Sequence, residues 1–355
     1  MTDLINKTSN QHYISQVEFR WNSINPKAEN DLMKVYRFKL INEGFLKLRC
    51  PEKKRIKYLS CGDDLFSLAV FDDDTRLNME KYFGYFEAEY NDRVSKFLSD
   101  IATKIQNSGE GLYKVDGSEF ISDIKFFQKI KFLNFIRNPH NIRRALKLFD
   151  FARDYIVHGT GGDFQLILNA LIKNKKTHRD YVCRTYGVTS SEFDSWIKLI
   201  LLFVYFDDNM MNPTLDGMMD EFFKAKELHT AVIIAYYPEE TRKSPLIPDV
   251  GSVVNDDMTY AFNISRSCFI VLEHTLLESE YSRNNAKKVA DLMGVPFTDD
   301  FFEVYKKHLQ GEKLISIYID DDELLSGYNS KCIEVSKEFV YSSSAVVHGA
   351  DVIRA

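Results

Sequence analysis

The chain has 355 residues, of which 45% are hydrophobic and 28% are charged, so its composition is that of a globular protein rather than a disordered or fibrous one. Its formal net charge of -6 argues against a uniformly basic protein that coats DNA non-specifically. The 5 cysteines form no CxxC pair, so neither a disulfide framework nor a zinc knuckle is expected.

The N-terminal third, residues 1–115, predicts a small part that mixes strands and helices. Short aromatic or β-branched segments between turn residues indicate strands at 35–40, 45–50 and 55–60. From residue 76 to 105 apolar residues recur every three or four positions, which is typical of a helix packed on one side. A stretch containing Gly and Ser then marks the end of this part.

The middle of the chain, residues 116–225, is expected to be helical. Its most apolar run, 196–206, includes Lys198 and is much shorter than the roughly 20 residues that a membrane span needs. This run predicts a buried helix, and no contact with a membrane is expected. The start of the sequence lacks the basic and apolar regions of a signal peptide, which favours a cytoplasmic protein.

The last part, residues 226–355, combines both kinds of element. Apolar segments at 230–237, 268–273 and 313–319 indicate strands, and a helical pattern covers 284–310. The fold class predicted for the whole chain is therefore α+β, with a small mixed N-terminal part, a helix-rich middle and a C-terminal part with several strands.

Basic residues concentrate in the helical middle. Between residues 121 and 185 there are 13 Lys or Arg and 5 Asp, whereas the rest of the chain is acidic. A local excess of this kind favours an anionic ligand such as a nucleic acid. The candidate nucleic-acid contacts are Arg143, Arg144, Lys173, Lys175, Lys176 and Arg179. The alternative is that these side chains lie on solvated helix faces.

The segment 151–162, FARDYIVHGTGG, contains the sharpest motif. Asp154 directly follows Arg153, His158 comes four residues later, and a glycine follows as it would at a helix end. The spacing resembles the R-polar-xxx-H motif of HEPN-type helical ribonucleases. The resemblance implies that Arg153 and His158 are catalytic, that Asp154 supports them, and that two copies share a cleft in a homodimer.

The chemistry of this motif suits RNA cleavage without a metal ion. Attack by the 2′-hydroxyl of RNA needs a proton acceptor near neutral pH, which His158 provides, and a cation at the phosphate, which Arg153 provides. The histidines show no paired-ligand spacing, so no metal and no cofactor is expected. The alternative is structural: His158 caps backbone carbonyls and Arg153 pairs with Asp150.

A second set of motifs extends over more of the chain. Residues 12–16 read HYISQ and resemble the HYVPQ opening of a bacterial family of unknown function whose members are often defence-associated, with Ser15 in place of the proline. Later residues match further landmarks of that family in order: Glu80, Glu87, 137–143 and 248–250.

These scattered polar residues suggest a second candidate site formed by His12, Gln16, Arg137 and Asp249. His12 and Gln16 are four residues apart, as on one helix face, although residues 17–21, VEFRW, indicate a strand. Arg137 offers a planar fork to a phosphate or carboxylate, and Asp249 is expected to orient His12. The alternative is a buried polar network that holds the N-terminal segment against the helical core.

The leading hypothesis is a cytoplasmic, metal-independent ribonuclease that acts as a defence or toxin-type effector, with RNA as its target and a restraining or activating partner protein. The first alternative is a non-catalytic subunit that senses phage or nucleic acid within a defence system. The second alternative is a small-molecule enzyme with its pocket near Asp249.

Overall fold

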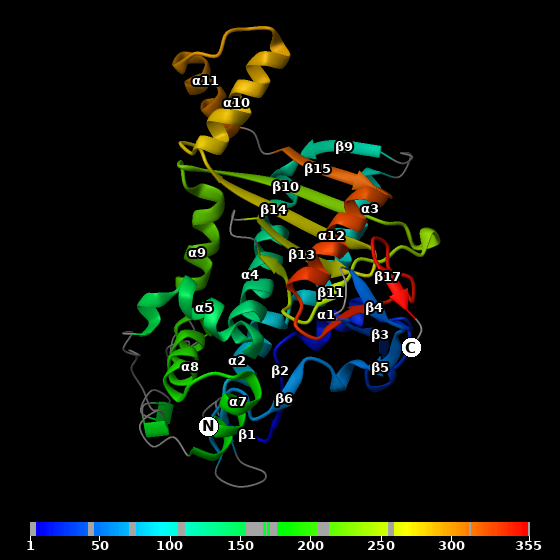
Figure 1. Cartoon of the computed structure of the whole chain (residues 1–355), viewed down its shortest axis with the longest axis vertical. Helices are drawn as coiled ribbons and strands as arrows, with labels where there is room; N and C mark the ends of the chain where they lie inside the picture. Colours follow the sequence, from blue (N-terminus) through cyan, green and yellow to red (C-terminus); the bar gives the residue numbers. More distant parts are fainter. Residues whose placement is uncertain are drawn as a thin grey trace.

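The computed structural model describes residues 5–41, 46–70, 76–105, 111–153, 166–167, 169–170, 176–204, 213–254, 259–311 and 314–353. Within these ranges the chain is α+β, with a small mixed N-terminal part, a helix-rich middle and a C-terminal part with several strands, as the sequence predicts (Figure 1). The boundaries after residues 115 and 225 stay predictions, and strands from the first part pair with strands from the last.

A six-stranded sheet spans the upper half of the molecule, in the order β12-β13-β14-β10-β15-β9 (Figure 1). Its strands are β9 (Gly111–Asp116), β10 (Leu228–Tyr236), β12 (Val253–Val254), β13 (Thr259–Ser265), β14 (Cys268–Leu276) and β15 (Leu314–Ile319). β10 and β15 run parallel, and the other neighbouring pairs are antiparallel. The predicted strands at 230–237, 268–273 and 313–319 are thereby confirmed.

The two faces of this sheet pack against different helices, because side chains alternate along each strand. In β14, Ile270 belongs to the core that includes α4 (Ile121–Arg137), whereas Phe269 faces α12 (Asp322–Val335). The rings of Phe269 and Tyr328 of α12 stack with centroids 4.1 Å apart. A strand buried on both faces explains the continuous apolar run in this part of the sequence.

A second sheet of four strands has the order β11-β16-β3-β5 and joins the two ends of the chain. Its strands are β3 (Lys34–Lys39), β5 (Glu52–Arg55), β11 (Ile247–Pro248) and β16 (Phe339–Ser342). The smaller sheets use β1 (Ile5–Asn6), β2 (Asn10–His12), β4 (Lys47–Arg49), β6 (Cys61–Asp63), β7 (Ser67–Val70), β8 (Arg76–Asn78) and β17 (Asp351–Ile353). β5 is an edge strand, and its exposed side chains are mostly basic.

The remaining helices surround these sheets. They are α1 (Gln16–Trp21), α2 (Glu80–Glu87), α3 (Tyr90–Lys104), α5 (Ile142–Leu148), α7 (Lys176–Tyr186), α8 (Ser190–Val204), α9 (Pro213–Lys224), α10 (Glu280–Met293) and α11 (Asp299–Gly311). The predicted buried helix is α8, where Trp196 is fully buried and donates to the backbone oxygen of Ile136 at 2.6 Å. Among the helices that the structure describes, none is both long enough and apolar enough to cross a membrane.

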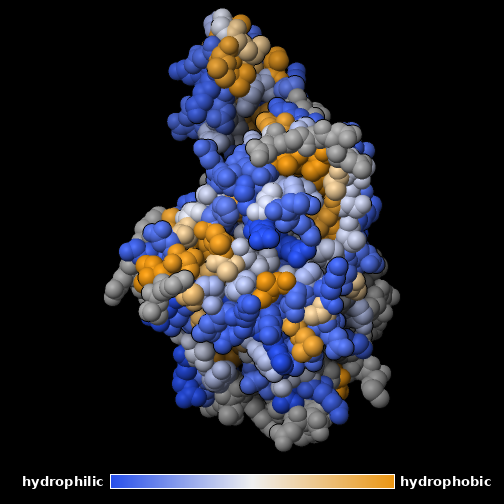
Figure 2. Space-filling model, turned by 90° about the vertical axis from the view of Figure 1, so that its right-hand side faces the viewer, coloured by the Kyte–Doolittle hydropathy of each residue, from blue (hydrophilic) through white to orange (hydrophobic). Residues whose placement is uncertain are grey.

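Helices α10 and α11 form a hairpin that projects from one end of the molecule (Figure 1). Figure 2 shows hydrophilic and hydrophobic side chains on different sides of this projection. Its exposed apolar residues include Leu292, Met293 and Val304, with 87%, 65% and 65% of their surface accessible. The hairpin therefore adds little to the buried core.

Three predictions of local structure in the N-terminal part need correction. Residues 17–21 lie in helix α1 rather than in a strand. Residues 55–60 are not a strand either, because β5 ends at Arg55. A 3-10 turn at Ile56–Tyr58 follows, and the Leu59 N–H donates a hydrogen bond to the Ile56 carbonyl at 3.1 Å. The helical pattern predicted at 76–105 begins too early, because residues 76–78 form strand β8, and the rest is divided into the two helices α2 and α3.

Candidate functional site

The N-terminal segment folds over the helical core through a short strand followed by a short helix. His12 ends β2, which pairs with β6 so that His12 lies opposite Cys61. Ser15 caps α1, because its hydroxyl accepts a hydrogen bond from the Val17 N–H at 3.3 Å and donates one to Oε2 of Glu87 at 2.6 Å. The side chain of Gln16 reaches back to Nδ1 of His12 at 3.5 Å.

Arg137, the last residue of α4, joins this segment to α2. Its Nη2 donates to Oε1 of Glu87 at 2.6 Å and to Oδ1 of Asn134 at 2.7 Å, and its guanidinium lies 4.6 Å from the ring centre of Phe83. The side chain is only 3% exposed. His12, Gln16, Glu80, Glu87 and Arg137 thus come together from three separate segments, and we call them the N-terminal cluster.

Several polar atoms of the N-terminal cluster are buried and lack a hydrogen-bond partner: Nε2 of His12, Oε1 of Glu80 and Nε of Arg137. Burial lowers the pKa of His12 to about 4, and the Arg137 cation also lowers it. Burial raises the pKa of Glu80 to about 7; Glu87 also raises it and Arg137 opposes the change. Unsatisfied buried groups of both charge types in one place are typical of a functional site rather than of an optimised core.

A buried ion pair continues the N-terminal cluster into the core. Nζ of Lys131 contacts Oε2 of Glu18, and both side chains are fully buried. Nδ2 of Asn134 donates to the other carboxylate oxygen of Glu18. The hydrogen bonds therefore run without a break from Lys131 through Asn134 to Arg137, which fits the buried polar network that the sequence left as an alternative.

Asp249 lies next to this network but has a different role from the one that the sequence suggests. Its carboxylate accepts the backbone N–H groups of Lys337 at 2.8 Å, Glu338 at 2.6 Å and Phe339 at 2.9 Å. Both oxygens are therefore occupied, and they hold the turn before β16 instead of orienting His12. Burial raises the pKa of Asp249, although these hydrogen bonds and His140 lower it.

The segments 137–143 and 248–250, which match two landmarks of the bacterial family, contact each other directly. Nδ2 of Asn138 donates to the backbone oxygen of Asp249 at 2.8 Å, and Nδ2 of Asn141 donates to that of Val250 at 3.1 Å. The side chain of Asn138 also accepts the His140 N–H at 3.0 Å, which fixes the 3-10 turn Pro139–Asn141. The turn therefore directs His140 away from α4 and toward Asp249.

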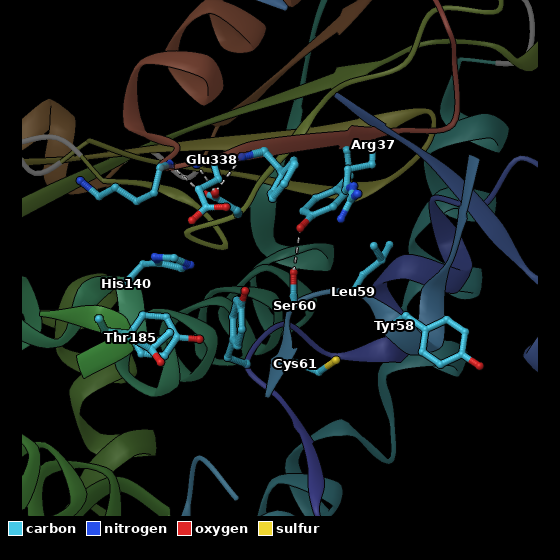
Figure 3. Close-up of a pocket in the computed structure, with 14 residues that line it drawn as sticks. Arg37, Tyr58, Leu59, Ser60, Cys61, His140, Thr185 and Glu338 are labelled. Carbon is cyan, nitrogen blue, oxygen red and sulfur yellow. Dashed lines mark hydrogen bonds between the residues drawn. The ribbon is translucent and has the colours of Figure 1, made fainter. Parts of the chain in front are cut away.

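A cavity of about 510 Å³ opens beside Asp249, and we call it the Asp249 pocket (Figure 3). Its lining comes from the N-terminal segment, β3, the residues around β6, the turn after α4, the end of α7, the loop with Asp249, and β16 with the residues just before it. The lining residues are Tyr13, Arg37, Tyr58, Leu59, Ser60, Cys61, His140, Thr185, Tyr186, Asp249, Lys337, Glu338, Phe339 and Tyr341.

Aromatic rings surround His140 in the Asp249 pocket. Its imidazole meets Tyr13 edge-on at 5.9 Å between ring centres and Tyr186 edge-on at 5.1 Å. Across the pocket, the hydroxyls of Ser60 and Tyr341 are 3.5 Å apart (Figure 3). Burial lowers the pKa of His140, and Asp249 and Glu338 oppose the change. A neutral imidazole can accept a proton, so the pocket combines flat aromatic surfaces with one candidate general base.

Two cations belong to the lining of the Asp249 pocket, Arg37 on β3 and Lys337 just before β16. Arg37 lies 4.4 Å from the ring centre of Phe339 and pairs with Glu52 at 3.1 Å, and Lys337 is exposed. Between residues 34 and 57 there are 9 Lys or Arg and 2 Glu, a denser excess than in the helical middle. This excess of basic residues could have been found in the sequence. The presence of Tyr186 and Ser60 in the pocket could not, because it depends on long-range packing and has no local sequence pattern.

Three of the basic residues predicted to contact nucleic acid have side chains that the structure describes, and all three are engaged with other protein groups. Arg143 pairs with Glu192 at 3.0 Å, and Arg179 approaches Asp194 at 3.5 Å. Arg144 donates to the backbone oxygen of Val254. Glu192 and Asp194 reduce the local excess of positive charge.

The other predicted residues are described in part or not at all. Arg153 ends the 3-10 turn Asp150–Arg153, and Lys176 begins α7. Asp154, His158, Lys173 and Lys175 lie outside the described residues. The arrangement of the R-polar-xxx-H motif therefore stays a prediction.

In the described part of the chain, no three His, Cys, Asp or Glu side chains are grouped as they would be to hold a metal ion. Comparison with known proteins finds no matching family model, no matching curated protein and no matching solved structure.

Proposed function

We propose that this protein is a cytoplasmic ribonuclease that works without a metal ion and acts as a defence or toxin-type effector. RNA is bound in the Asp249 pocket. The observation that carries the proposal is the position of His140, a half-buried and readily neutral imidazole, between two tyrosine rings in a pocket bordered by Arg37 and Lys337.

The aromatic lining of the pocket and the basic strand beside it suit a single-stranded nucleic acid, although within the lining Asp249 and Glu338 balance Arg37 and Lys337. Stacking of a base on an aromatic side chain contributes about 1–3 kcal/mol, and Tyr13, Tyr58 and Tyr186 offer such surfaces. Phosphates bind to Lys and Arg through release of counterions, and the edge strand β5 presents exposed basic side chains next to the pocket. RNA is usually recognised through unpaired bases of this kind.

The chemistry requires a proton acceptor for the 2′-hydroxyl and a positive charge near the phosphate. His140 is the acceptor in this proposal, and Lys337 or Arg37 supplies the charge. The residues Arg153, Asp154 and His158 are the second candidate set for the same reaction. Their resemblance to HEPN-type ribonucleases supports a homodimer, and an effector of this type also needs a restraining or activating partner protein.

One observation favours a non-catalytic sensing or interaction subunit instead. In a catalytic His–Asp pair the carboxylate orients the imidazole, but both oxygens of Asp249 are already bonded to the backbone of residues 337–339. A pocket of this kind can bind RNA without cleaving it.

The experiment measures binding and cleavage of a 5′-labelled RNA in EDTA by the wild type, His140→Ala and His158→Ala. His308→Ala, on exposed α11, is the matched control for loss of a histidine. Cleavage lost in His140→Ala alone supports the assignment to the Asp249 pocket, and cleavage lost in His158→Ala alone moves the reaction to the R-polar-xxx-H motif. Binding without cleavage by the wild type indicates the sensing subunit. Absence of binding refutes both functions.

A further inference from the structure

A second cavity, of about 520 Å³, lies between the helical middle and the central sheet. Its walls come from α4, α5, α9 and the strands β13 and β14. Most of the lining is apolar and aromatic: Phe132, Phe135, Phe149, Met218, Met219 and Phe222. A largely apolar cavity of a few hundred Å³ with few polar groups is typical of a small-molecule site.

Two polar residues of the lining, Gln128 and His274, belong to a hydrogen-bonded chain that begins at Thr230, outside the lining. The Thr230 hydroxyl donates to the backbone oxygen of Phe222 at 2.6 Å, so at its 2.9 Å contact with His274 it accepts from Nδ1–H. His274 is then left with an unprotonated Nε2, which accepts from Nε2 of Gln128 at 3.0 Å. Burial lowers the pKa of His274 to about 4, in agreement with a neutral ring.

This chain fixes the orientation of the Gln128 amide. Because Nε2 is the donor to His274, the other amide atom, Oε1, is the acceptor that remains. Oε1 is buried and without a hydrogen-bond partner, and Gln128 as a whole is 4% exposed and lines the cavity. A buried acceptor without a donor is costly, so a ligand with an N–H or O–H group would be stabilised there.

The charged groups of the cavity are both positive. Arg144 and Lys147, on α5, belong to the lining, and no Asp or Glu is among its described residues. Arg144 donates through Nη2 to the backbone oxygen of Val254, and its guanidinium carries further N–H groups on Nε and Nη1. An anionic group at this side of the cavity would meet two cations.

We propose that this cavity is a binding site for a small organic anion. The ligand has a flat apolar ring system for the aromatic walls, a carboxylate or similar anionic group for Arg144 and Lys147, and a hydrogen-bond donor for Oε1 of Gln128. The site is separate from the Asp249 pocket and does not depend on the ribonuclease proposal.

The test uses two fluorescent probes that differ only in the donor: 6-hydroxy-2-naphthoate and 6-methoxy-2-naphthoate. Binding to the full chain is measured by titration calorimetry, with melting curves to show that each variant is folded. The hydroxyl probe is expected to bind once per chain and about tenfold more tightly than the methoxy probe, because only it can donate to Gln128.

The protein side of the test replaces Arg144 and uses its neighbour as the control. Arg144→Gln is expected to weaken the hydroxyl probe by about tenfold or more, because it removes a charge-assisted contact. Arg143→Gln is expected to leave affinity unchanged, because Arg143 is exposed and paired with Glu192. Absence of saturable binding, equal affinities for the two probes, or equal effects of the two substitutions would overturn the proposal.

Discussion

Replacement of Glu80 by glutamine is expected to stabilise the protein at alkaline pH and to change its stability little near pH 4.5. In the folded protein burial raises the pKa of this carboxyl from 4.5 to about 7. An acid whose pKa is raised by folding binds its proton more tightly in the folded state than in the unfolded state. The free energy of unfolding therefore falls as the pH rises from 4.5 through 7. Each pKa unit corresponds to about 1.4 kcal/mol, so the loss amounts to about 3 kcal/mol at pH 8.

That magnitude is an upper value, because solvent reaches part of the Glu80 side chain. Glutamine has nearly the same shape and carries no charge, so Glu80→Gln removes the cost of burying a carboxylate. Burial sets most of this cost; Glu87 adds to it, and Arg137 and the His12 backbone reduce it.

The measurement is the free energy of unfolding in urea at pH 4.5 and pH 8 for the wild type and Glu80→Gln. Glu87→Gln is the matched control, because Glu87 pairs with Arg137 and accepts from Ser15, so its replacement is expected to destabilise the protein at pH 8. A stabilisation by Glu80→Gln that is the same at both pH values, or a destabilisation at pH 8, would refute the reasoning.

Two further predictions concern the buried charges beside the candidate site. Lys131→Met leaves the fully buried Glu18 without its cation and is expected to cost about 3–5 kcal/mol; adding Glu18→Gln should restore most of this in urea denaturation, and a double variant as unstable as the single one would contradict it. Asp249→Asn replaces a carboxylate that accepts three backbone N–H groups and should cost at least about 2 kcal/mol at pH 8. A loss below about 1 kcal/mol would show that the turn at 337–339 does not depend on this charge.

Three strands of the central sheet were predictable because they carry continuous apolar runs, whereas β9, β12 and β13 were not predicted, and β9 lies in the stretch that was expected to end the N-terminal part. β10, β14 and β15 are buried, and such runs between turn residues identify strands without knowledge of their partners. Helix α1 was mistaken for a strand, although Ser15 and Glu18 have the S-x-x-E spacing of a capping box. Glu18 does not complete that box in the structure, since it pairs with Lys131 in the core.

The N-terminal cluster was only partly predictable. The motifs pointed to His12, Gln16 and Arg137, and the structure brings His12 next to Gln16 and Arg137 next to Glu87. The role of Asp249 could not be predicted from the sequence, because its hydrogen-bond partners are backbone groups almost ninety residues further along the chain. The Asp249 pocket could not be predicted for the same reason: its walls come from seven separate segments that only tertiary packing brings together.

The pairing of β3 with β16 has a consequence for the protein during its synthesis. Arg37 lies opposite Tyr341, so the second sheet joins residues about 300 positions apart. At about 5–20 residues per second, a ribosome needs roughly 15–60 s to make the chain between them. Throughout that interval one edge of β3 has no partner strand. The Asp249 pocket also lacks the wall that residues 337–341 supply. A nascent chain therefore has no complete pocket, and whatever that pocket does begins only after β16 has left the ribosome.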